Sequence, residues 1–164
     1  MYTIRKATTD DCKLIHELAE KIFIPTYQYM HTPEQSEYMM NWMYSTESLT
    51  AQMTGKHTFF ILLKEETPCG YLSVEEEGED LFHLQKIYVL PDYQGTGAGK
   101  ILFEKAIQFI KEIHPAPCTM ELNVNRSNKS VHFYEKMGMK IAREGDFHIG
   151  NGFYMNDYIM SLDL

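Results

Sequence analysis

The chain has 164 residues, of which 44% are hydrophobic, and this length and apolar content fit one globular domain over residues 1–164 with a sizeable core. The formal net charge of −8 argues against nucleic acid and anionic membranes as partners, because both select basic surfaces, and it is compatible with a cationic ligand. The cysteines Cys12, Cys69 and Cys118 are far apart, so neither a disulfide framework nor a cysteine metal site is expected.

The first third of the chain predicts a strand followed by helices. Residues 2–7, YTIRKA, alternate as a short strand does, and the polar residues at 8–11 can begin a helix. Apolar residues then recur with helical spacing, and Pro25 is expected to end that helix. These apolar positions are Ile15, Leu18, Ala19, Ile22 and Phe23. Residues 26–53 are rich in tyrosine and methionine, and Pro33 divides them into two short helical pieces.

Three strands are expected next. Residues 57–66 and 69–77 read as two strands joined by a turn at 67–68, where a threonine precedes a proline. Residues 81–90 form a third apolar run, which Pro91 should stop because it lacks the N–H that a strand donates.

A long amphipathic helix is expected after the glycines at 95–99, and it should end before Pro115. Its apolar face comprises Leu102, Ala106, Phe109, Ile110 and Ile113. Residues 119–125, TMELNVN, then predict another strand.

The last part of the chain predicts a short helix and two closing strands. Residues 127–138 give the helix, with Ser127 or Asn128 as its cap and Gly138 as its terminator. Residues 139–164 read as two strands. The order strand, helices, three strands, helix, strand, helix, two strands indicates a mixed α/β or α+β arrangement, with no repeat or linker that would mark a second domain.

The segment VLPDYQGTGAGKIL, residues 89–102, places three glycines between a strand and a helix. Such a turn can aim several backbone N–H groups at one anion, and the positive end of the helix adds to the attraction. The plain alternative is a turn that only starts a helix. A Walker loop does not fit, because three residues rather than four separate Gly95 from Gly99 and Ile101 follows Lys100. A dinucleotide fingerprint fails as well, because it requires glycine in place of Lys100.

Two motifs carry a resemblance to a known family. KIYVLPDYQGTGAGKIL, residues 86–102, resembles the Gln/Arg-x-x-Gly-x-Gly/Ala segment of the GNAT acyl-CoA N-acyltransferases, with Gln94, Gly97 and Gly99 at the fixed positions. LNVNRSNKSVHFYEKMGM, residues 122–139, resembles the second signature of that family. The resemblance covers essentially the whole chain and extends to the PaiA-type polyamine acetyltransferases. It implies a GNAT fold: a single α/β domain with a central mixed, mostly antiparallel sheet flanked by helices.

The resemblance also implies acetyl-CoA as the co-substrate. The backbone of Ile87, Tyr88 and Val89 would pair with the pantetheine arm as a peptide strand does. Asn128 matches a family asparagine that contacts the coenzyme, although a helix cap is the alternative, and Lys136 matches a nearby basic position, although a solvated lysine is the alternative. The N–H groups that would hold the pyrophosphate belong to Gln94, Gly95, Thr96, Gly97, Ala98, Gly99 and Lys100.

For catalysis, Tyr134 resembles the family tyrosine near the coenzyme's sulfur, where a phenol can protonate the departing thiolate. Relatives often carry a glutamate where this chain has Gln85 or Asn123, and an amide cannot accept the proton of the attacking amine. We therefore expect deprotonation through water by His83, with Glu121 or an acid of the EEEGED run as alternatives.

The acceptor is expected to be a small-molecule primary amine, and a polyamine such as spermidine would fit the seven carboxylates between Glu65 and Asp80 as an electrostatic funnel. A solvated acidic surface is the alternative. Residues 26–53 would cover the substrate, or else form ordinary core or a homodimer contact. A protein N-terminus or lysine is the rival acceptor, and a non-catalytic acyl-CoA sensor is the rival class.

Two further absences shape the expectations. The seven histidines show no ligand spacing, so no metal is expected. No apolar stretch approaches the roughly 18 residues of a membrane span, and the start of the chain has no apolar signal segment, so a cytoplasmic protein is expected.

Overall fold

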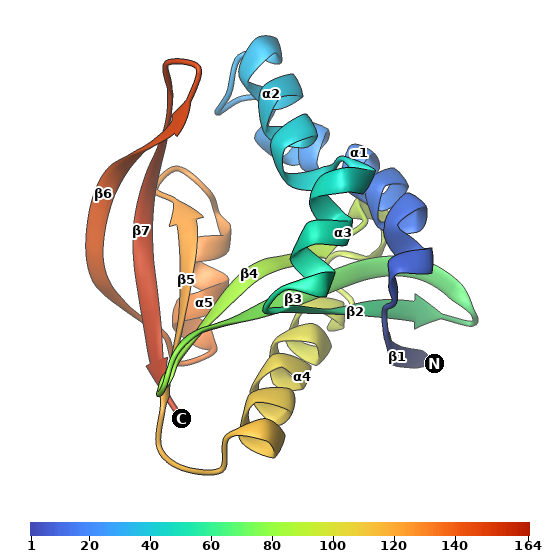
Figure 1. Ribbon diagram of the computed structural model, residues 1–164, viewed down its shortest axis with the longest axis vertical. Coiled ribbons are helices and arrows are strands. Elements are labelled where there is room, and N and C mark those ends of the chain that lie inside the picture. The colour runs from blue at the N-terminus through green and yellow to red at the C-terminus, as the bar shows by residue number, and fades with distance from the viewer.

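One sheet of seven strands forms the framework of the protein, in a computed structural model that describes residues 1–164 (Figure 1). The strand order across the sheet is β1-β2-β3-β4-β5-β7-β6, and every neighbouring pair is antiparallel except β4 and β5. This confirms the predicted mixed, mostly antiparallel sheet. The elements in chain order are β1 (Tyr2–Lys6), η1 (Thr9–Asp11), α1 (Cys12–Tyr27), α2 (Pro33–Tyr44), α3 (Thr46–Thr54), β2 (His57–Lys64), β3 (Thr67–Gly78), β4 (Leu81–Val89), η2 (Pro91–Tyr93), α4 (Ala98–Ile113), β5 (Thr119–Asn125), α5 (Ser130–Lys136), β6 (Lys140–Gly150) and β7 (Phe153–Asp163).

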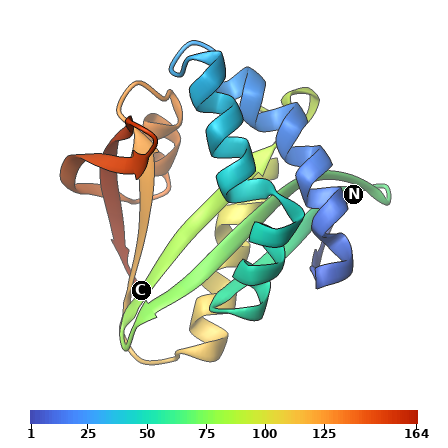
Figure 2. The ribbon, with the colours of Figure 1, turned by 45° about the horizontal axis from the view of Figure 1, so that its top comes forward.

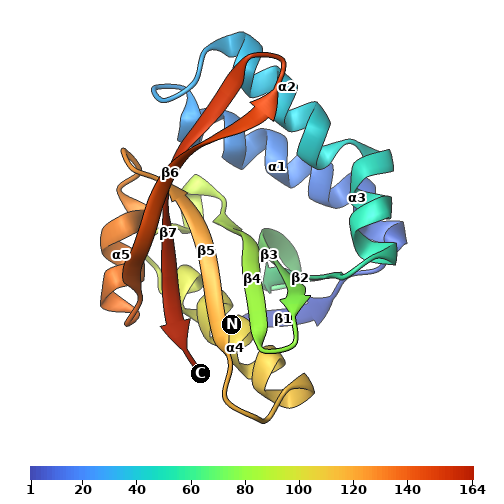
Figure 3. The ribbon, with the colours of Figure 1, turned by 60° about the vertical axis from the view of Figure 1, so that its left-hand side comes forward.

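The parallel pair β4 and β5 is bonded over only three positions and then diverges. The pairing runs from Leu81 opposite Thr119 to His83 opposite Glu121, and both strands continue beyond it. Figure 3 shows the two strands close together at one end and apart at the other. A parallel pair needs a crossover connection, which α4 supplies. Past His83 the facing edges of β4 and β5 therefore carry backbone groups without a partner strand, which a ligand can satisfy.

Helices cover both faces of the sheet, with α1 to α3 on one face and α4 on the other (Figure 2). The face under α4 and α5 holds one apolar core, and the face under α1 to α3 holds a second. Helix α4 is strongly amphipathic, and Leu102, Phe103 and Ile110 are fully buried. Each such side chain contributes roughly 1.5–3 kcal/mol of transfer free energy, so α4 is anchored firmly behind the splayed strands. None of the helices combines the length and the apolarity that crossing a membrane requires.

Helix α1 continues through Pro25 and ends at Tyr27, so the prediction that Pro25 ends the helix was wrong by two residues. Proline removes one N–H from the last turn, where the loss costs a single hydrogen bond. The neighbouring Thr26 hydroxyl donates to the Ile22 carbonyl at 2.6 Å, which adds a side-chain hydrogen bond to this last turn of α1. The consequence is that Thr26 and Tyr27 stay on the helix and face the sheet.

The turn between β2 and β3 lies at Glu65 and Glu66, two residues before the predicted position. Both residues have positive φ, 48° and 67°, as a type I′ hairpin turn requires. Pro68 belongs to β3 instead and lies opposite Leu63, where the register shifts. A bulge of this kind tolerates the missing N–H of proline.

The acidic run between residues 65 and 80 does not form one surface. Glu65 and Glu66 lie at the turn before β3, whereas the other five carboxylates lie at the far end of that strand or just beyond it. Several have partners within the protein: Glu65 pairs with the N-terminal ammonium and Asp80 with His114. The expected funnel of seven carboxylates is therefore divided between two ends of the sheet.

The remaining elements follow the sequence. Helix α4 ends at Ile113, before Pro115, and β5, α5, β6 and β7 all form where expected. Asn128 caps the start of α5, since its side-chain oxygen accepts from the Ser130 N–H at 2.8 Å. Gly138, with φ of +100°, ends α5, because that conformation disfavours any residue with a Cβ.

The tip of the β6–β7 hairpin reaches helix α2 (Figure 3). The Tyr38 hydroxyl donates to the Ile149 carbonyl at 2.7 Å, and the Gln35 amide donates to the Tyr154 carbonyl at 3.1 Å. Gly150 has φ of +100°, and a Cβ at this position would lie 2.4 Å from the Tyr38 hydroxyl. The hairpin therefore depends on glycine at 150 for its contact with α2.

Replacing Gly150 with alanine is expected to lower the free energy of unfolding more than the same change at Gly152. Both glycines have positive φ, so each alanine pays a left-handed backbone cost of about 1–2 kcal/mol. Only at Gly150 does the new methyl also clash with Tyr38, which adds about 1–3 kcal/mol, whereas nothing lies within 4 Å at Gly152. Urea unfolding of the two variants checks this, and equal midpoints with equal slopes would contradict the proposed contact.

Candidate active site

A cavity of about 740 Å³ opens where β4 and β5 part. Its wall combines the end of α1, the splayed strands, the glycine segment and the start of α5. The lining residues are Ile22, Thr26, Tyr27, Tyr29, Met30, Leu84, Gln85, Ile87, Tyr88, Val89, Gln94, Gly95, Gly97, Gly99, Lys100, Leu122, Asn123, Val124, Ser127, Asn128, Lys129, Ser130, Phe133 and Tyr134. The structure thus brings together most of the residues that the sequence predicted for the coenzyme.

The glycine segment forms one end of this cavity. Gly95 and Gly97 have φ of 77° and 89°, and nothing lies within 4 Å of a Cβ placed on either, so the backbone conformation rather than space requires glycine. Helix α4 begins directly afterwards at Ala98. The first backbone hydrogen bond of the helix runs from the Ile101 N–H to the Gly97 carbonyl. The N–H groups of Gly95 to Lys100 make no backbone hydrogen bond and are available to an anion. The Gln94 N–H, which was predicted to join them, instead donates to the Pro91 carbonyl at 3.2 Å. Gln94 fixes the segment to β4 by donating to the Val89 carbonyl at 3.1 Å.

Four of the predicted residues do not line the cavity. Thr96 and Ala98 belong to the glycine segment, but the Thr96 hydroxyl bonds to Tyr2 at 2.6 Å and the Ala98 side chain is buried in the core under α4. Lys136 is exposed in the last turn of α5, at the opposite end of that helix from Asn128. His83 is buried on β4 just before Leu84 and Gln85, which do line the cavity.

Tyr134 lies in the wall of the cavity and is only 8% exposed. Its ring packs against Phe133 and Phe103, with centroids 5.4 and 6.4 Å away. Burial raises the pKa of Tyr134 well above its usual value, and the neighbouring Tyr27 adds to the rise. The phenol is therefore protonated at neutral pH. Its hydroxyl has no hydrogen-bond partner in the protein and is not sealed from the cavity, so it can donate to a ligand.

The aromatic segment 26–53 divides between core and cavity. Tyr44 is fully buried and accepts from the Tyr71 hydroxyl at 2.7 Å, so it belongs to the core under α1 to α3. Tyr29 and Met30 instead line the cavity, and Tyr29 is 91% exposed. Of the three roles that the sequence left open, core packing is confirmed for Tyr44, whereas substrate cover by Tyr29 and Met30 and a homodimer contact stay predictions.

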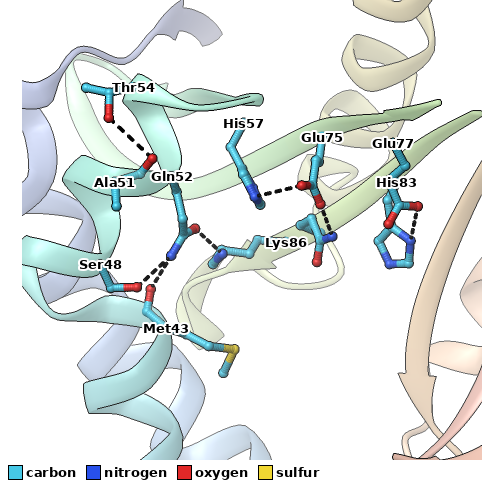
Figure 4. Close-up of polar contacts among 11 residues, drawn as sticks. Met43, Ser48, Ala51, Gln52, Thr54, His57, Glu75, Glu77, His83 and Lys86 are labelled. Atoms are coloured by element: carbon cyan, nitrogen blue, oxygen red, sulfur yellow. Dashed lines mark hydrogen bonds and ion pairs between the residues drawn. The ribbon is translucent and has the colours of Figure 1, made fainter. Parts of the chain in front are cut away.

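His83, Glu77 and Glu121 form a cluster, whereas the sequence named His83, Glu121 and the EEEGED acids only as alternative bases. His83 Nδ1 lies 3.1 Å from Glu77 Oε1 (Figure 4). Glu121 lies opposite His83 on β5 and is the third member of the cluster. Three candidate ligand atoms of these residues lie within 4.8 Å of one another, a spacing that can hold a metal ion. Arg143, however, donates to both Glu121 oxygens at 3.0 and 3.1 Å. The three residues come from three strands, so their sequence spacing gives no metal motif.

Two amides in the cavity wall each donate to a carboxylate that is not part of that wall. Gln85 Nε2 donates to Glu75 Oε1 at 2.7 Å, and Asn123 Nδ2 donates to Asp157 Oδ2 at 3.2 Å. Asp157 is almost completely buried, and this burial raises its carboxyl pKa although the Asn123 hydrogen bond opposes the rise. Glu75 also lies 3.4 Å from His57 Nε2. The sequence identified both amides only as missing carboxylates.

Lys86 is a buried cation whose side chain lies on the face of β4 that α3 covers (Figure 4). It is 6% exposed, donates to Gln52 Oε1 at 2.6 Å, and lies over the rings of Tyr44 and Phe59 at 5.5 and 5.3 Å. Burial lowers the pKa of Lys86 from 10.5 to about 8, although Glu75 opposes the change. Lys86 thus ties α3 to the sheet beside the cavity at an electrostatic cost.

Comparison with known proteins agrees with this geometry. A family model described as an acetyltransferase (GNAT) domain matches residues 27–162. A relative named an uncharacterized N-acetyltransferase, from Methanocaldococcus jannaschii, is 27% identical over 144 residues, which are 85% of this chain and 61% of that protein. Another of the same description, from Mycobacterium bovis, is 30% identical over 122 residues, which are 74% of this chain and 72% of that protein. The chain thus spans less than two thirds of the length of the Methanocaldococcus relative.

A solved structure shows the same fold. PaiA N-acetyltransferase from Thermoplasma acidophilum, in complex with coenzyme A, superimposes with a TM-score of 0.84 at 23% identity, over 100% of this chain and 99% of that one. The fold predicted from the two motifs is therefore confirmed.

Because Lys86 is buried, the free energy of unfolding is expected to depend on pH through this side chain. Because its pKa is lower in the folded state, the unfolded chain binds more protons between about pH 8 and 10.5, and the folded state gains stability as pH rises through that window. Relative to Lys86→Met, the wild-type free energy of unfolding should rise by roughly 2–3 kcal/mol between pH 7 and pH 10. Urea titrations of both proteins at each pH measure this, and parallel pH curves would contradict it.

Proposed function

The chain belongs to the GNAT acetyltransferase family, and from this premise we propose that it moves an acetyl group from acetyl-CoA to a primary amine by direct attack. The observation that carries the proposal is that one cavity joins three features. These are the glycine segment with its free N–H groups, the unpaired edges of the splayed strands, and the unpartnered hydroxyl of Tyr134.

These features would divide the coenzyme among them. The pyrophosphate would accept from N–H groups between Gly95 and Lys100, where the positive end of α4 adds to the attraction. The pantetheine arm would extend β4 along Ile87 to Val89, using backbone groups that β5 leaves unpaired. The thioester would then lie near Tyr134. Asn128 is a cavity residue as well as a helix cap, so both of its expected roles are compatible.

The proposed reaction needs two protons to leave the acceptor nitrogen. An alkylamine arrives as an ammonium, since its pKa is near 10.4, and must lose one proton before its lone pair attacks the thioester carbon. The C–N bond then forms, the C–S bond breaks, and the thiolate takes the Tyr134 proton. The second nitrogen proton restores the phenol, so no charge remains on this buried side chain. The products are the N-acetylamine, free coenzyme A and one released proton.

His83 is our candidate for the group that takes the first proton. Its Nδ1 lies 3.1 Å from Glu77 Oε1, so a carboxylate fixes the orientation of the imidazole. It precedes the cavity residues Leu84 and Gln85 on β4 and does not itself line the cavity, so the proposed transfer would run through a water molecule. Glu121 is the less favourable alternative, because both of its oxygens accept from Arg143.

For the acceptor we propose a small primary amine, with a polyamine such as spermidine as the leading case. The net charge of −8 and the carboxylates of Glu75 and Asp157 behind the cavity wall favour a cation. Tyr29 and Met30 add aromatic and apolar surface for a methylene chain. A peptide N-terminus or lysine remains the rival acceptor and is part of the test.

The first test is release of free thiol from acetyl-CoA with spermidine, spermine, diamines, lysine and N-terminal peptides as acceptors. Turnover with at least one amine is expected, and Tyr134→Phe should lower kcat by about 10²-fold or more while the affinity for coenzyme A stays the same. Tyr154→Phe is the matched control, because that hydroxyl is exposed and outside the cavity. Coenzyme binding with no turnover on any acceptor would favour the acyl-CoA sensor, and turnover on peptides alone would favour a protein acceptor.

A second test addresses the base. His83→Ala should lower kcat by about 10²–10⁴-fold on the best acceptor, with the largest loss at low pH, where the fraction of free amine is smallest. His132→Ala is the control, because that imidazole is exposed on α5 away from the cluster. If His83→Ala keeps the full rate below pH 7 and Glu121→Gln does not, the base is Glu121.

A further inference from the structure

Two side-chain amides line the cavity from opposite sides of the splay, Gln85 on β4 and Asn123 on β5. The last bonded positions of the two strands are His83 and Glu121, and each amide lies two residues further along its strand. Gln85 and Asn123 therefore lie at the narrow end of the opening, where β4 and β5 begin to part. This is the part of the cavity furthest along β4 from the glycine segment.

A carboxylate fixes the orientation of each amide. Gln85 Nε2 donates to Glu75 Oε1 at 2.7 Å, and Asn123 Nδ2 donates to Asp157 Oδ2 at 3.2 Å. An ionised carboxylate only accepts hydrogen bonds, so it selects the amide orientation in which the nitrogen points toward it. The carbonyl oxygens, Gln85 Oε1 and Asn123 Oδ1, have no partner within the protein and are not among its fully buried polar atoms. Both oxygens are therefore left for a molecule in the cavity.

Two carbonyl oxygens match the chemistry of a neutral primary amine. Such an amine has two N–H groups and one lone pair, so two acceptors hold both N–H groups and leave the lone pair free to attack. A carboxylate at either position, as relatives often carry, could also accept a proton from the ammonium, whereas an amide oxygen only binds the nitrogen. With Glu75 and Asp157 behind the amides, the negative charge that attracts a cation lies one side chain away from the reacting nitrogen.

We propose that Gln85 and Asn123 bind the acceptor nitrogen through their carbonyl oxygens, and that Glu75 and Asp157 act as positioning residues for these amides. The inference rests on the proposed acetyl transfer and specifies its acceptor. The site selects primary amines, because a secondary amine or an alcohol supplies only one donor. The same arrangement explains how the chain can lack carboxylates at 85 and 123 and still bind an amine.

The experiment measures KM for the best primary amine and for acetyl-CoA in the wild type, Gln85→Met and Asn123→Leu. Each variant should raise KM for the amine roughly 3- to 10-fold, as loss of one hydrogen bond does, with KM for acetyl-CoA unchanged. Gln108→Met, on the exposed face of α4, is the matched control and should change neither constant. The N-methyl derivative of the same amine should be a poorer wild-type substrate, and the two variants should discriminate less against it.

The positioning roles of Glu75 and Asp157 are tested by comparing KM for the amine in single and double variants. Glu75→Gln should also raise KM for the amine, but it should add little in the Gln85→Met background, because both changes remove the same oriented oxygen. Asp157→Asn and Asn123→Leu should show the same non-additivity. If Asn123→Leu does not fold, KM for the amine in Gln85→Met and the comparison with the N-methyl derivative in the wild type decide the inference.

The outcomes separate this inference from the proposed function. An active wild type whose amine KM is unmoved in Gln85→Met and Asn123→Leu, or which uses the N-methyl derivative equally well, overturns the inference alone. A wild type that binds coenzyme A but acetylates no amine overturns both. Additive effects of Glu75→Gln and Gln85→Met overturn the positioning role of Glu75.

Discussion

The short parallel pairing of β4 and β5 is the constraint on which the rest of the structure depends. Backbone hydrogen bonds join the strands only as far as His83 and Glu121, and beyond this point each strand keeps an unpaired edge. Unpaired backbone groups inside a protein must find a partner, so the splay requires either water or an extended ligand. The glycine segment lies at the open end and the amides of Gln85 and Asn123 at the closed end, which gives the cavity a direction along β4.

Burial gives the polar groups around this cavity their character. Burial raises the pKa of the Tyr134 phenol and lowers the pKa of the Lys86 ammonium. The carboxylate of Asp157 is held by the Asn123 amide. Each of these groups costs free energy to bury, and Gln52 and Asn123 offset part of that cost with hydrogen bonds. Buried polar groups with shifted pKa values beside a cavity are typical of catalytic and binding sites.

The sequence predicted the order of elements, the glycine segment and Tyr134, because strand alternation, helical spacing and a contiguous motif are local signals. It misplaced the ends of α1 and the β2–β3 turn, where Pro25 and Pro68 suggested boundaries that tertiary contacts override. It could not predict the pairing of Gln85 with Glu75, because a hydrogen bond between neighbouring strands depends on register. Lys86 gave no signal either, since its burial follows from the position of α3.

The central claim is that the coenzyme occupies the splay as an added strand, and hydrogen–deuterium exchange with and without coenzyme A tests it most directly. The account predicts slower exchange at the backbone amides of Ile87 to Val89 and of the glycine segment, with little change in β1 and β2. Coenzyme binding that leaves β4 and the glycine segment unprotected, or that protects a different surface, would contradict the account.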